Sequence, residues 1–187
     1  MQKFLVKVVG STPYMQHRMD DTKLTEWLKL RGNILEPEIS EPEQKAIFHS
    51  YVDKDGKFYI PNEHFKQCFL NGGKNVKGKV GATTKSLKQV VAGMWFIRPF
   101  NIPFRKFDEI DSRSAVNQNV KARVMVHRPK WNEWQCEFEL HIDEPNMTIE
   151  TIKEIIRIGG NHVGVGSYRP EHAGEFGRFD ATVEKIS

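Results

Sequence analysis

The clearest pattern in the sequence is an alternation of hydrophobic and polar residues over 119–127 and again over 134–142. Side chains of a β-strand point to opposite faces in turn, so this alternation predicts two strands, each with one buried and one solvated face. The turn residues between them, Arg128 to Glu133, indicate an antiparallel hairpin. Cys136 falls on the inward-facing set, which predicts a small core residue instead of a nucleophile.

The same pattern predicts two more strands and two helices. Residues 3–9 and 177–186 alternate like strands, whereas residues 61–72 and 148–158 carry apolar side chains at helical spacing. Thr148 is placed to cap the second helix, because a short polar side chain can accept a hydrogen bond from a free backbone N–H group.

The order strand, helix, strand, strand, helix, strand predicts an α+β fold with a ferredoxin-like (RRM-like) βαββαβ core. Residues 10–60 and 74–118 then form insertions after the first strand and after the first helix. A chain of 187 residues has the usual length of one domain, so we predict a single domain over residues 1–187.

The positive charge is unevenly distributed along the chain. The formal net charge is only +4, yet residues 64–107 hold nine Lys or Arg and no Asp or Glu. Such a concentration of positive charge is typical of a surface that binds a polyanion, most often nucleic acid. A solvated lysine-rich loop is the simpler alternative.

Cysteine content and hydropathy bear on the compartment. Two cysteines suggest no disulfide framework. No apolar run approaches the ~20 residues that a membrane helix needs. The first residues form a charged alternation unlike a signal peptide. We therefore expect a cytoplasmic protein without membrane association.

Motifs that would indicate an enzyme or a cofactor are incomplete. Gly73–Lys79 resembles a phosphate-binding loop, but Val80 stands where such a loop needs Ser or Thr. No His, Cys or carboxylate pair has zinc-ligand spacing, so neither a metal nor a cofactor is expected. Weak candidates for a cleavage site are His17, Asp20 and Asp21, which an ordinary surface loop explains as well.

Two segments combine basic and aromatic side chains. The first is a glycine-rich loop in which Tyr168 and Arg169 offer a flat ring and a planar cation. The second is the predicted hairpin, with these residues on its outward face and tip: Lys121, Arg123, Arg128, Lys130 and Trp131. Single-stranded RNA or DNA is bound in this way, because cations follow the backbone while rings stack on bases. A solvated hairpin or a protein-binding surface is the alternative.

Three segments resemble the repeat-associated mysterious protein (RAMP) superfamily. They are the end of the opening strand, Gly10–Pro13, the entry into the first helix, Tyr59–Lys66, and the glycine-rich segment Gly164–Phe179. More narrowly, they resemble the backbone subunits that coat guide RNA in CRISPR effector complexes, and short relatives of these in phages and prophages. The resemblance implies a ferredoxin-like fold and assembly with copies of the same chain or with other effector subunits.

The resemblance also implies particular RNA contacts. In the family, the glycine-rich loop and a lysine of the first helix face RNA. The matching positions here are Gly164, Gly166, Tyr168, Arg169, Arg178 and Lys66. Some members cut target RNA with an aspartate after the first strand, and Asp20 and Asp21 lie near that place without the surrounding motif.

Together, these features predict a protein that binds single-stranded, guide-type RNA through a basic groove without catalysis. Lysines of the second insertion are expected to grip phosphates: Lys74, Lys77, Lys79, Lys85 and Lys88. Three alternatives stay open: a phage-encoded mimic that inhibits a host CRISPR complex, an RNA endonuclease, and a protein-interaction module without nucleic acid.

Overall fold

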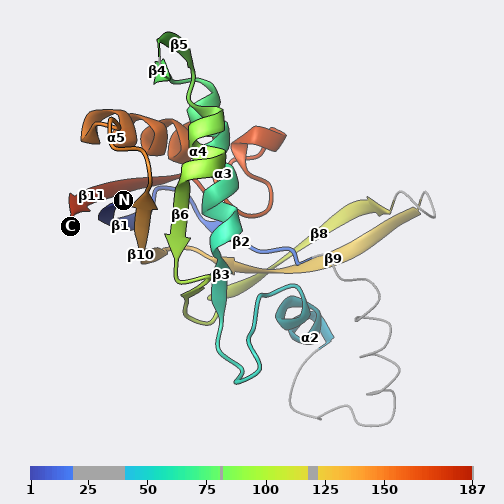
Figure 1. Cartoon of the computed structure of the whole chain (residues 1–187). Coiled ribbons are helices and arrows are strands. Elements are labelled where there is room, and N and C mark those ends of the chain that lie inside the picture. The colour runs from blue at the N-terminus through green and yellow to red at the C-terminus, as the bar shows by residue number, and fades with distance from the viewer. Residues whose placement is uncertain (19–40, 81, 118–121, 187) are drawn as a thin grey trace.

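The structure is a computed structural model that describes residues 1–187 apart from 19–40, 81, 118–121 and 187. Helices pack against a main sheet, and a long two-stranded ribbon extends away from it (Figure 1). The chain is mixed α/β and its sheets are antiparallel, which confirms that coarse part of the predicted class. Among the described residues, no helix has the length and hydropathy to cross a membrane.

Four strands form the main sheet in the spatial order β11-β1-β10-β6, each antiparallel to its neighbours. Their bounds are β1 Gln2–Gly10, β6 Trp95–Arg98, β10 Gln135–Ile142 and β11 Phe179–Lys185. Side chains alternate as strand geometry requires: Phe4, Val6 and Val8 of β1 are buried, and the residues between them face the other way.

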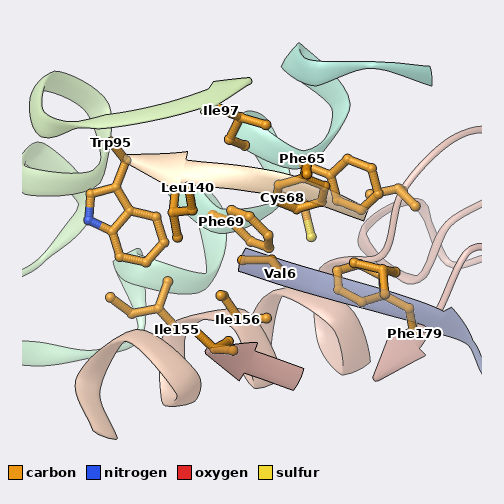
Figure 2. Packing of buried hydrophobic residues seen from close by; sticks show 14 of the residues in the cluster. Val6, Phe65, Cys68, Phe69, Trp95, Ile97, Leu140, Ile155, Ile156 and Phe179 are labelled. Atoms are coloured by element: carbon orange, nitrogen blue, oxygen red, sulfur yellow. The ribbon is translucent and has the colours of Figure 1, made fainter. Parts of the chain in front are cut away.

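Two helices, α3 (Asn62–Lys74) and α5 (Ile149–Ile158), cover one face of this sheet. The core between them is aromatic and aliphatic (Figure 2). The rings of Phe65 on α3 and Phe138 on β10 have centroids 4.8 Å apart. Each fully buried side chain of this kind contributes about 1.5–3 kcal/mol to the free energy of unfolding. The apolar stripes predicted for both helices are therefore confirmed as core faces.

Thr148 and Gly159 cap the two ends of α5. The predicted cap is confirmed, since Thr148 Oγ1 accepts a hydrogen bond from the backbone N–H of Thr151 at 3.3 Å. At the other end, α5 stops at Ile158 and Gly159 is its C-cap. The chain continues through a π-helical turn, Gly159–Val163, before it enters the glycine-rich loop.

The predicted hairpin of 119–127 with 134–142 is wrong. A second sheet has the order β2-β9-β8, formed by β2 (Tyr14–Met15), β9 (Ala122–Trp131) and β8 (Glu109–Asn117). Strand β9 pairs with β8 along nine residue pairs, while β10 pairs with β1 and β6 in the main sheet. The alternation was real, but it does not say which strand is the partner. The short turn after Trp131 carries the chain from one sheet to the other.

The predicted second insertion, 74–118, also needs correction because it contains β6, a strand of the main sheet. It also contains a β-hairpin, β4–β5, and a short helix, α4. The smaller elements are α2 Glu41–Phe48, β3 Tyr59–Pro61, β4 Lys77–Val80, β5 Thr83–Ser86, α4 Lys88–Met94 and β7 Asn101–Pro103. Strand β3 pairs with β7, and β4 pairs with β5.

Candidate nucleic-acid interface

The glycine-rich loop is held against the segment that leaves β1. The backbone N–H of Ser167 donates to the carbonyl of Met15 at 2.9 Å, and that of Gly177 donates to the carbonyl of Pro13 at 2.7 Å. Gly166 has a φ of +79°, and a Cβ there would lie 2.3 Å from the carbonyl oxygen of Met15. This position therefore needs glycine both for its backbone conformation and for the close approach of the two chains.

Arg128 of β9 lies beside this loop, buried and only partly hydrogen-bonded. Its side chain is 4% exposed, and its Cζ lies 4.9 Å from the ring centroid of Tyr168. Its Nε–H donates to Nδ1 of His17 at 3.2 Å. Nη1 is buried without a hydrogen-bond partner, and none of the described carboxylates forms an ion pair with this guanidinium. A buried, unpaired cation is costly in a protein unless an anion compensates it.

A second guanidinium approaches the same ring from β8. Arg113 Cζ lies 5.4 Å from the Tyr168 centroid and 4.9 Å from that of Phe176, another residue of the glycine-rich loop. Arg113 is exposed, and its Nε pairs with Asp111 Oδ1 at 2.7 Å. The loop and the β8–β9 ribbon thus share a group of two cations and two rings, the combination that binds single-stranded nucleic acid.

A cleft of about 330 Å³ lies between this loop and the first turns of α3. His17, His64, Gln67 and Tyr168 are among the residues that line it. Burial, and to a smaller extent the nearby Arg169 cation, lowers the pKa of His64 to about 4. His64 is therefore neutral at pH 7, and its Nδ1 is hydrogen-bonded to the hydroxyl of Tyr14 at 3.3 Å.

Cys68 also lines the cleft but is not activated. Burial raises the pKa of its thiol well above the ordinary range, so the thiol stays protonated at neutral pH. A protonated, buried thiol is a poor nucleophile and a poor metal ligand. Among the described residues, no group of three or more His, Cys, Asp or Glu could hold a metal ion.

Gly164, Arg169 and Arg178 are the remaining predicted residues of the glycine-rich segment. Arg169 Nη1–H donates to the carbonyl of Gly166 at 3.1 Å, and Arg169 also pairs with Glu171 at 2.9 Å. Its charge is therefore partly neutralised. Gly164, with a φ of +72°, starts the loop, and Arg178 is exposed at its end, where its backbone N–H donates to Thr12 Oγ1 at 3.0 Å.

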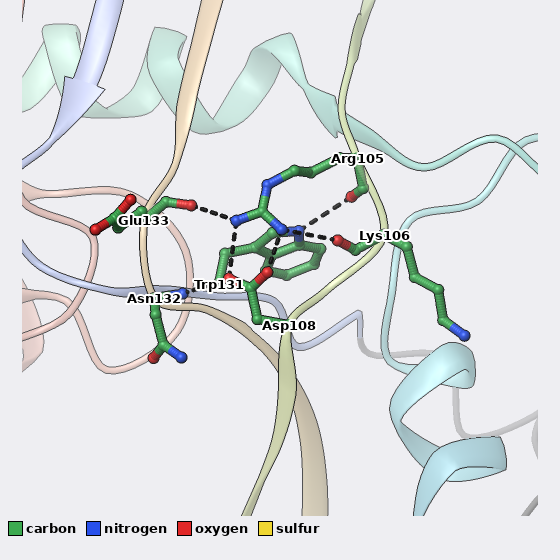
Figure 3. A network of polar contacts seen from close by, with 6 residues as sticks. All are labelled: Arg105, Lys106, Asp108, Trp131, Asn132 and Glu133. Atoms are coloured by element: carbon green, nitrogen blue, oxygen red, sulfur yellow. Dashed lines mark hydrogen bonds and ion pairs between the residues drawn. The ribbon is translucent and has the colours of Figure 1, made fainter.

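Trp131 does not lie at an exposed hairpin tip, so that expectation is wrong. The side chain is fully buried, and its indole N–H donates to the carbonyl of Arg105 at 3.0 Å. Figure 3 shows the surrounding network, in which Arg105 pairs with Asp108, whose carboxylate accepts the backbone N–H of Asn132 at 2.9 Å. Trp131 therefore anchors the crossover between the sheets and has no free ring face for a base.

Lys66 is engaged by the protein itself. Its ammonium donates to the backbone carbonyls of Val91 and Trp95, near the end of α4, and lies 5.8 Å from the centroid of the Phe96 ring. Burial lowers the pKa of this amine. The side chain thereby ties α3 to the start of β6, while its contact with RNA stays a prediction.

The other predicted cations are dispersed. Lys130 pairs with Glu109 at 2.6 Å, and Arg123 is exposed on β9. Asp20, Asp21 and Lys121 lie outside the described residues. Five lysines are exposed on or beside the β4–β5 hairpin and form no ion pair with the described part of the chain: Lys74, Lys77, Lys79, Lys85 and Lys88.

The structure separates these lysines from the cleft. The cleft borders the first turns of α3, whereas the hairpin follows its C-terminal end (Figure 1). A helix of 13 residues is about 20 Å long. Sequence reasoning named Arg128, Tyr168 and Arg169, but it missed Arg113, Phe176 and His64. Strand pairing brings Arg113 to the loop, whereas His64 and Phe176 lie within the segments Tyr59–Lys66 and Gly164–Phe179 that the sequence had already marked.

Comparison with known proteins gives a likeness of fold. No protein-family model matches the sequence, and no curated protein matches it. One similar solved chain belongs to the cryo-EM structure of the Type III-B Cmr-beta bound to cognate target RNA, with 14% identity and a TM-score of 0.50 over 100% of this chain. This protein spans 61% of the length of that chain. Another belongs to a Type IV-B CRISPR complex, with 10% identity and a TM-score of 0.47, covering 97% of this chain and 90% of that one. The protein therefore has a mixed α/β fold like that of a chain in the Type III-B Cmr-beta structure.

Proposed function

We propose that this protein binds single-stranded RNA along the glycine-rich loop, where the loop meets the β8–β9 ribbon beside the cleft that it forms with α3. The observation that carries the proposal is Arg128, a guanidinium that is 4% exposed and has an unpartnered Nη1 beside the ring of Tyr168. A phosphate group would supply the missing acceptor and the missing negative charge.

The chemistry around Arg128 suits RNA better than a small anion. Arg113 and the rings of Tyr168 and Phe176 extend the site along the loop, and a strand needs both phosphate contacts and stacking surfaces. His64 is neutral at pH 7 and adds no positive charge, and Arg128 is the cation of this group that forms no ion pair with a described carboxylate. The proposal has no catalytic step, since it needs only binding and positioning.

The proposal also covers the type of fold and the kind of subunit that this protein represents. The strand order β11-β1-β10-β6, with α3 and α5 on one face, supports a ferredoxin-like core of the RAMP type. The likeness of fold to a chain of an RNA-bound Type III-B complex supports the choice of RNA. We propose a cytoplasmic, guide-RNA-binding subunit that assembles with copies of itself or with other effector subunits. A phage-encoded mimic of such a subunit is the second candidate, and co-purification with host effector proteins separates the two.

Fluorescence anisotropy with a labelled RNA of about 30 nucleotides, measured across a salt series, tests the proposal. We expect log Kd to rise steeply with log salt, because bound RNA releases counterions. Arg128→Gln and Arg113→Gln should each weaken binding about tenfold, the cost of one charged hydrogen-bond donor. Lys153→Gln, an exposed change on α5, is the matched control.

Because Arg128 is buried, thermal unfolding must accompany these titrations. Arg113→Gln, at an exposed site, tests the same loop surface without the risk of misfolding. The proposal is overturned if wild-type protein binds RNA without salt dependence, or if both arginine variants fold and bind RNA like the Lys153→Gln control.

A further inference from the structure

The cleft between the glycine-rich loop and α3 is small and partly apolar. Its volume of about 330 Å³ is at the lower end of the range for sites that hold one small molecule. Cys68 and Val165 line it and are almost fully buried, and Tyr168 lines it as well. A single planar group such as a nucleobase suits this space, whereas a stretch of several nucleotides does not fit.

The helix side of the cleft carries a carboxylate, Glu63. This residue lies in the first turn of α3, is exposed, and forms no hydrogen bond or ion pair with the described part of the chain. Gln67 lies one turn further along the same face of α3 and also lines the cleft. A carboxylate accepts hydrogen bonds and repels phosphate, so this side suits a group that carries hydrogen-bond donors and not the RNA backbone.

The loop side of the cleft carries a cation, Arg169. Its Nη1–H donates to the carbonyl of Gly166 at 3.1 Å, and its Nε–H donates to Glu171 Oε2 at 3.0 Å. Nη2 pairs with the same carboxylate at 2.9 Å. A guanidinium has five N–H groups, so others stay available to an acceptor in the cleft. The cleft therefore offers an acceptor on the side of α3 and donors on the side of the loop.

Guanine is the RNA base whose edges match these two sides. Its Watson–Crick edge carries two adjacent donors, N1–H and the N2 amino group, which can meet both oxygens of a carboxylate. Its O6 and N7 atoms are acceptors, and arginine binds this pair more often than any other base contact. Adenine, cytosine and uracil each place an acceptor beside the donor on that edge, so a carboxylate would face a repulsive lone pair.

We propose that this cleft binds one guanine base of the RNA strand and that Glu63 selects it. The inference rests on the RNA binding proposed above and adds a base preference to it, because phosphate contacts alone carry no sequence information. Tyr168 joins the two parts of the site, since it contacts Arg128 and also lines the cleft. A strand can thus place a phosphate at Arg128 and turn a neighbouring base into the cleft.

Fluorescence anisotropy with a set of labelled RNAs tests the preference. Each RNA is a uridine strand of about ten nucleotides, within the span of a single-strand site. The strands differ only at the central base, which is guanine, hypoxanthine, adenine or uracil. The guanine strand should bind about tenfold more tightly than the adenine strand, the effect of one base contact with two hydrogen bonds. Hypoxanthine lacks the N2 amino group and keeps one of the two donors, so its strand should fall between them.

Glu63→Gln tests the selecting residue. An amide offers one acceptor and one donor, which complement adenine, so the tenfold preference for guanine should disappear or reverse. Glu150→Gln is the matched control, because Glu150 is the second residue of α5 as Glu63 is of α3, is exposed, and does not line the cleft. It removes the same charge from the first turn of a helix and should keep the preference. A general effect of lost negative charge would raise the affinity for all four RNAs and leave their ratio unchanged.

Equal affinity of wild-type protein for the four RNAs overturns the inference, and so does a wild-type preference that persists in Glu63→Gln. In both cases, salt-dependent binding of the uridine strand leaves the proposed RNA binding intact, whereas failure to bind every RNA rejects both. Guanosine monophosphate, titrated into RNA-free protein, tests a free nucleotide as the source of the base. Guanine-selective binding of the monophosphate, with equal affinities for the four RNAs, would assign the cleft to a free nucleotide and reject the inference.

Discussion

Arg128 and Tyr168 stack on each other, with the guanidinium carbon 4.9 Å from the ring centroid. Arg128 belongs to β9, and Tyr168 belongs to the glycine-rich loop, 40 residues further along the chain. Tyr168 has a φ of +53°, a backbone conformation that residues other than glycine rarely adopt. The contact with Arg128 and the backbone hydrogen bonds of the loop therefore hold Tyr168 in this unfavourable conformation.

The ring of Tyr168, and not its hydroxyl, should matter for RNA binding. Tyr168→Ala is expected to weaken RNA binding about tenfold, within the range of one lost base-stacking contact. Tyr168→Phe keeps the ring and should bind within about twofold of wild type, on the same energy scale. Anisotropy titrations at fixed salt check both. Equal losses in the two variants would point to the hydroxyl and contradict the stacking role.

Gly166 should be far less replaceable than a glycine of similar backbone conformation elsewhere. Gly166→Ala forces a Cβ to within 2.3 Å of the Met15 carbonyl, so the loop must move away from the strand and RNA affinity should fall. Gly56 has the same φ of +79° but open space around it. Gly56→Ala should therefore cost only about 1–2 kcal/mol of backbone strain and leave RNA affinity unchanged.

Urea unfolding and RNA titration of both variants check this comparison. The expected result is a loss of affinity in Gly166→Ala alone. If Gly56→Ala weakens RNA binding as much, the effect comes from general destabilisation and not from the position of the loop.

Lys66 should act on stability before it acts on RNA. Lys66→Met removes the hydrogen bonds to the carbonyls of Val91 and Trp95 and should lower the free energy of unfolding by about 1–3 kcal/mol. Lys153→Met, at an exposed site on α5, should change it by less than about 0.5 kcal/mol. Chemical denaturation checks the pair. If Lys66→Met is as stable as wild type but binds RNA more weakly, the result would contradict the stabilising role and support the RNA contact that the family resemblance implies for Lys66.

His64 should make stability depend on pH below neutrality. Its pKa is about 4 in the folded state and about 6.5 when the chain is unfolded, because burial disfavours the imidazolium. Between these values the unfolded chain binds more protons, so the free energy of unfolding falls as the pH drops from about 6.5 to 4. The full contribution is present above pH 6.5 and has an upper limit of about 3 kcal/mol.

Denaturation at a series of pH values checks this linkage. His64→Gln should remove most of the pH dependence in that window. An unchanged profile in His64→Gln would assign the dependence to other groups.

Local periodicity predicted the strands and helices whose pattern is long, and it failed where pairing partners are distant. The strand at 134–142 and the helix after Thr148 were foreseen because alternation and capping are local signals. The segment of β6 was left in the second insertion and not placed in the main sheet, since its four residues carry only two inward side chains, Trp95 and Ile97. Trp131 was misplaced for a related reason: its partner, the carbonyl of Arg105, becomes its neighbour only when the sheets form.

The candidate site was foreseen in part. Tyr168, Arg169 and Arg128 stand out as rings and cations in the sequence, and the structure brings Arg128 to Tyr168. Arg113 and His64 came from other elements, and no spacing rule connects them to the loop. Charge patterning located the basic segment correctly, but it could not tell that the hairpin lysines project away from the cleft.

The base of the β4–β5 hairpin is closed by its own backbone. The N–H of Leu87 donates to the carbonyl of Val76 at 2.9 Å, and Ser86 Oγ is hydrogen-bonded to the carbonyls of Gly73 and Lys74 at 3.2 and 3.0 Å. The chain thus leaves and re-enters the folded core at nearly one point. The hairpin can be shortened, lengthened or exchanged for another sequence without altering the path of α3 or β6. It is a natural site for grafting, where new binding specificity can be installed while the scaffold is kept.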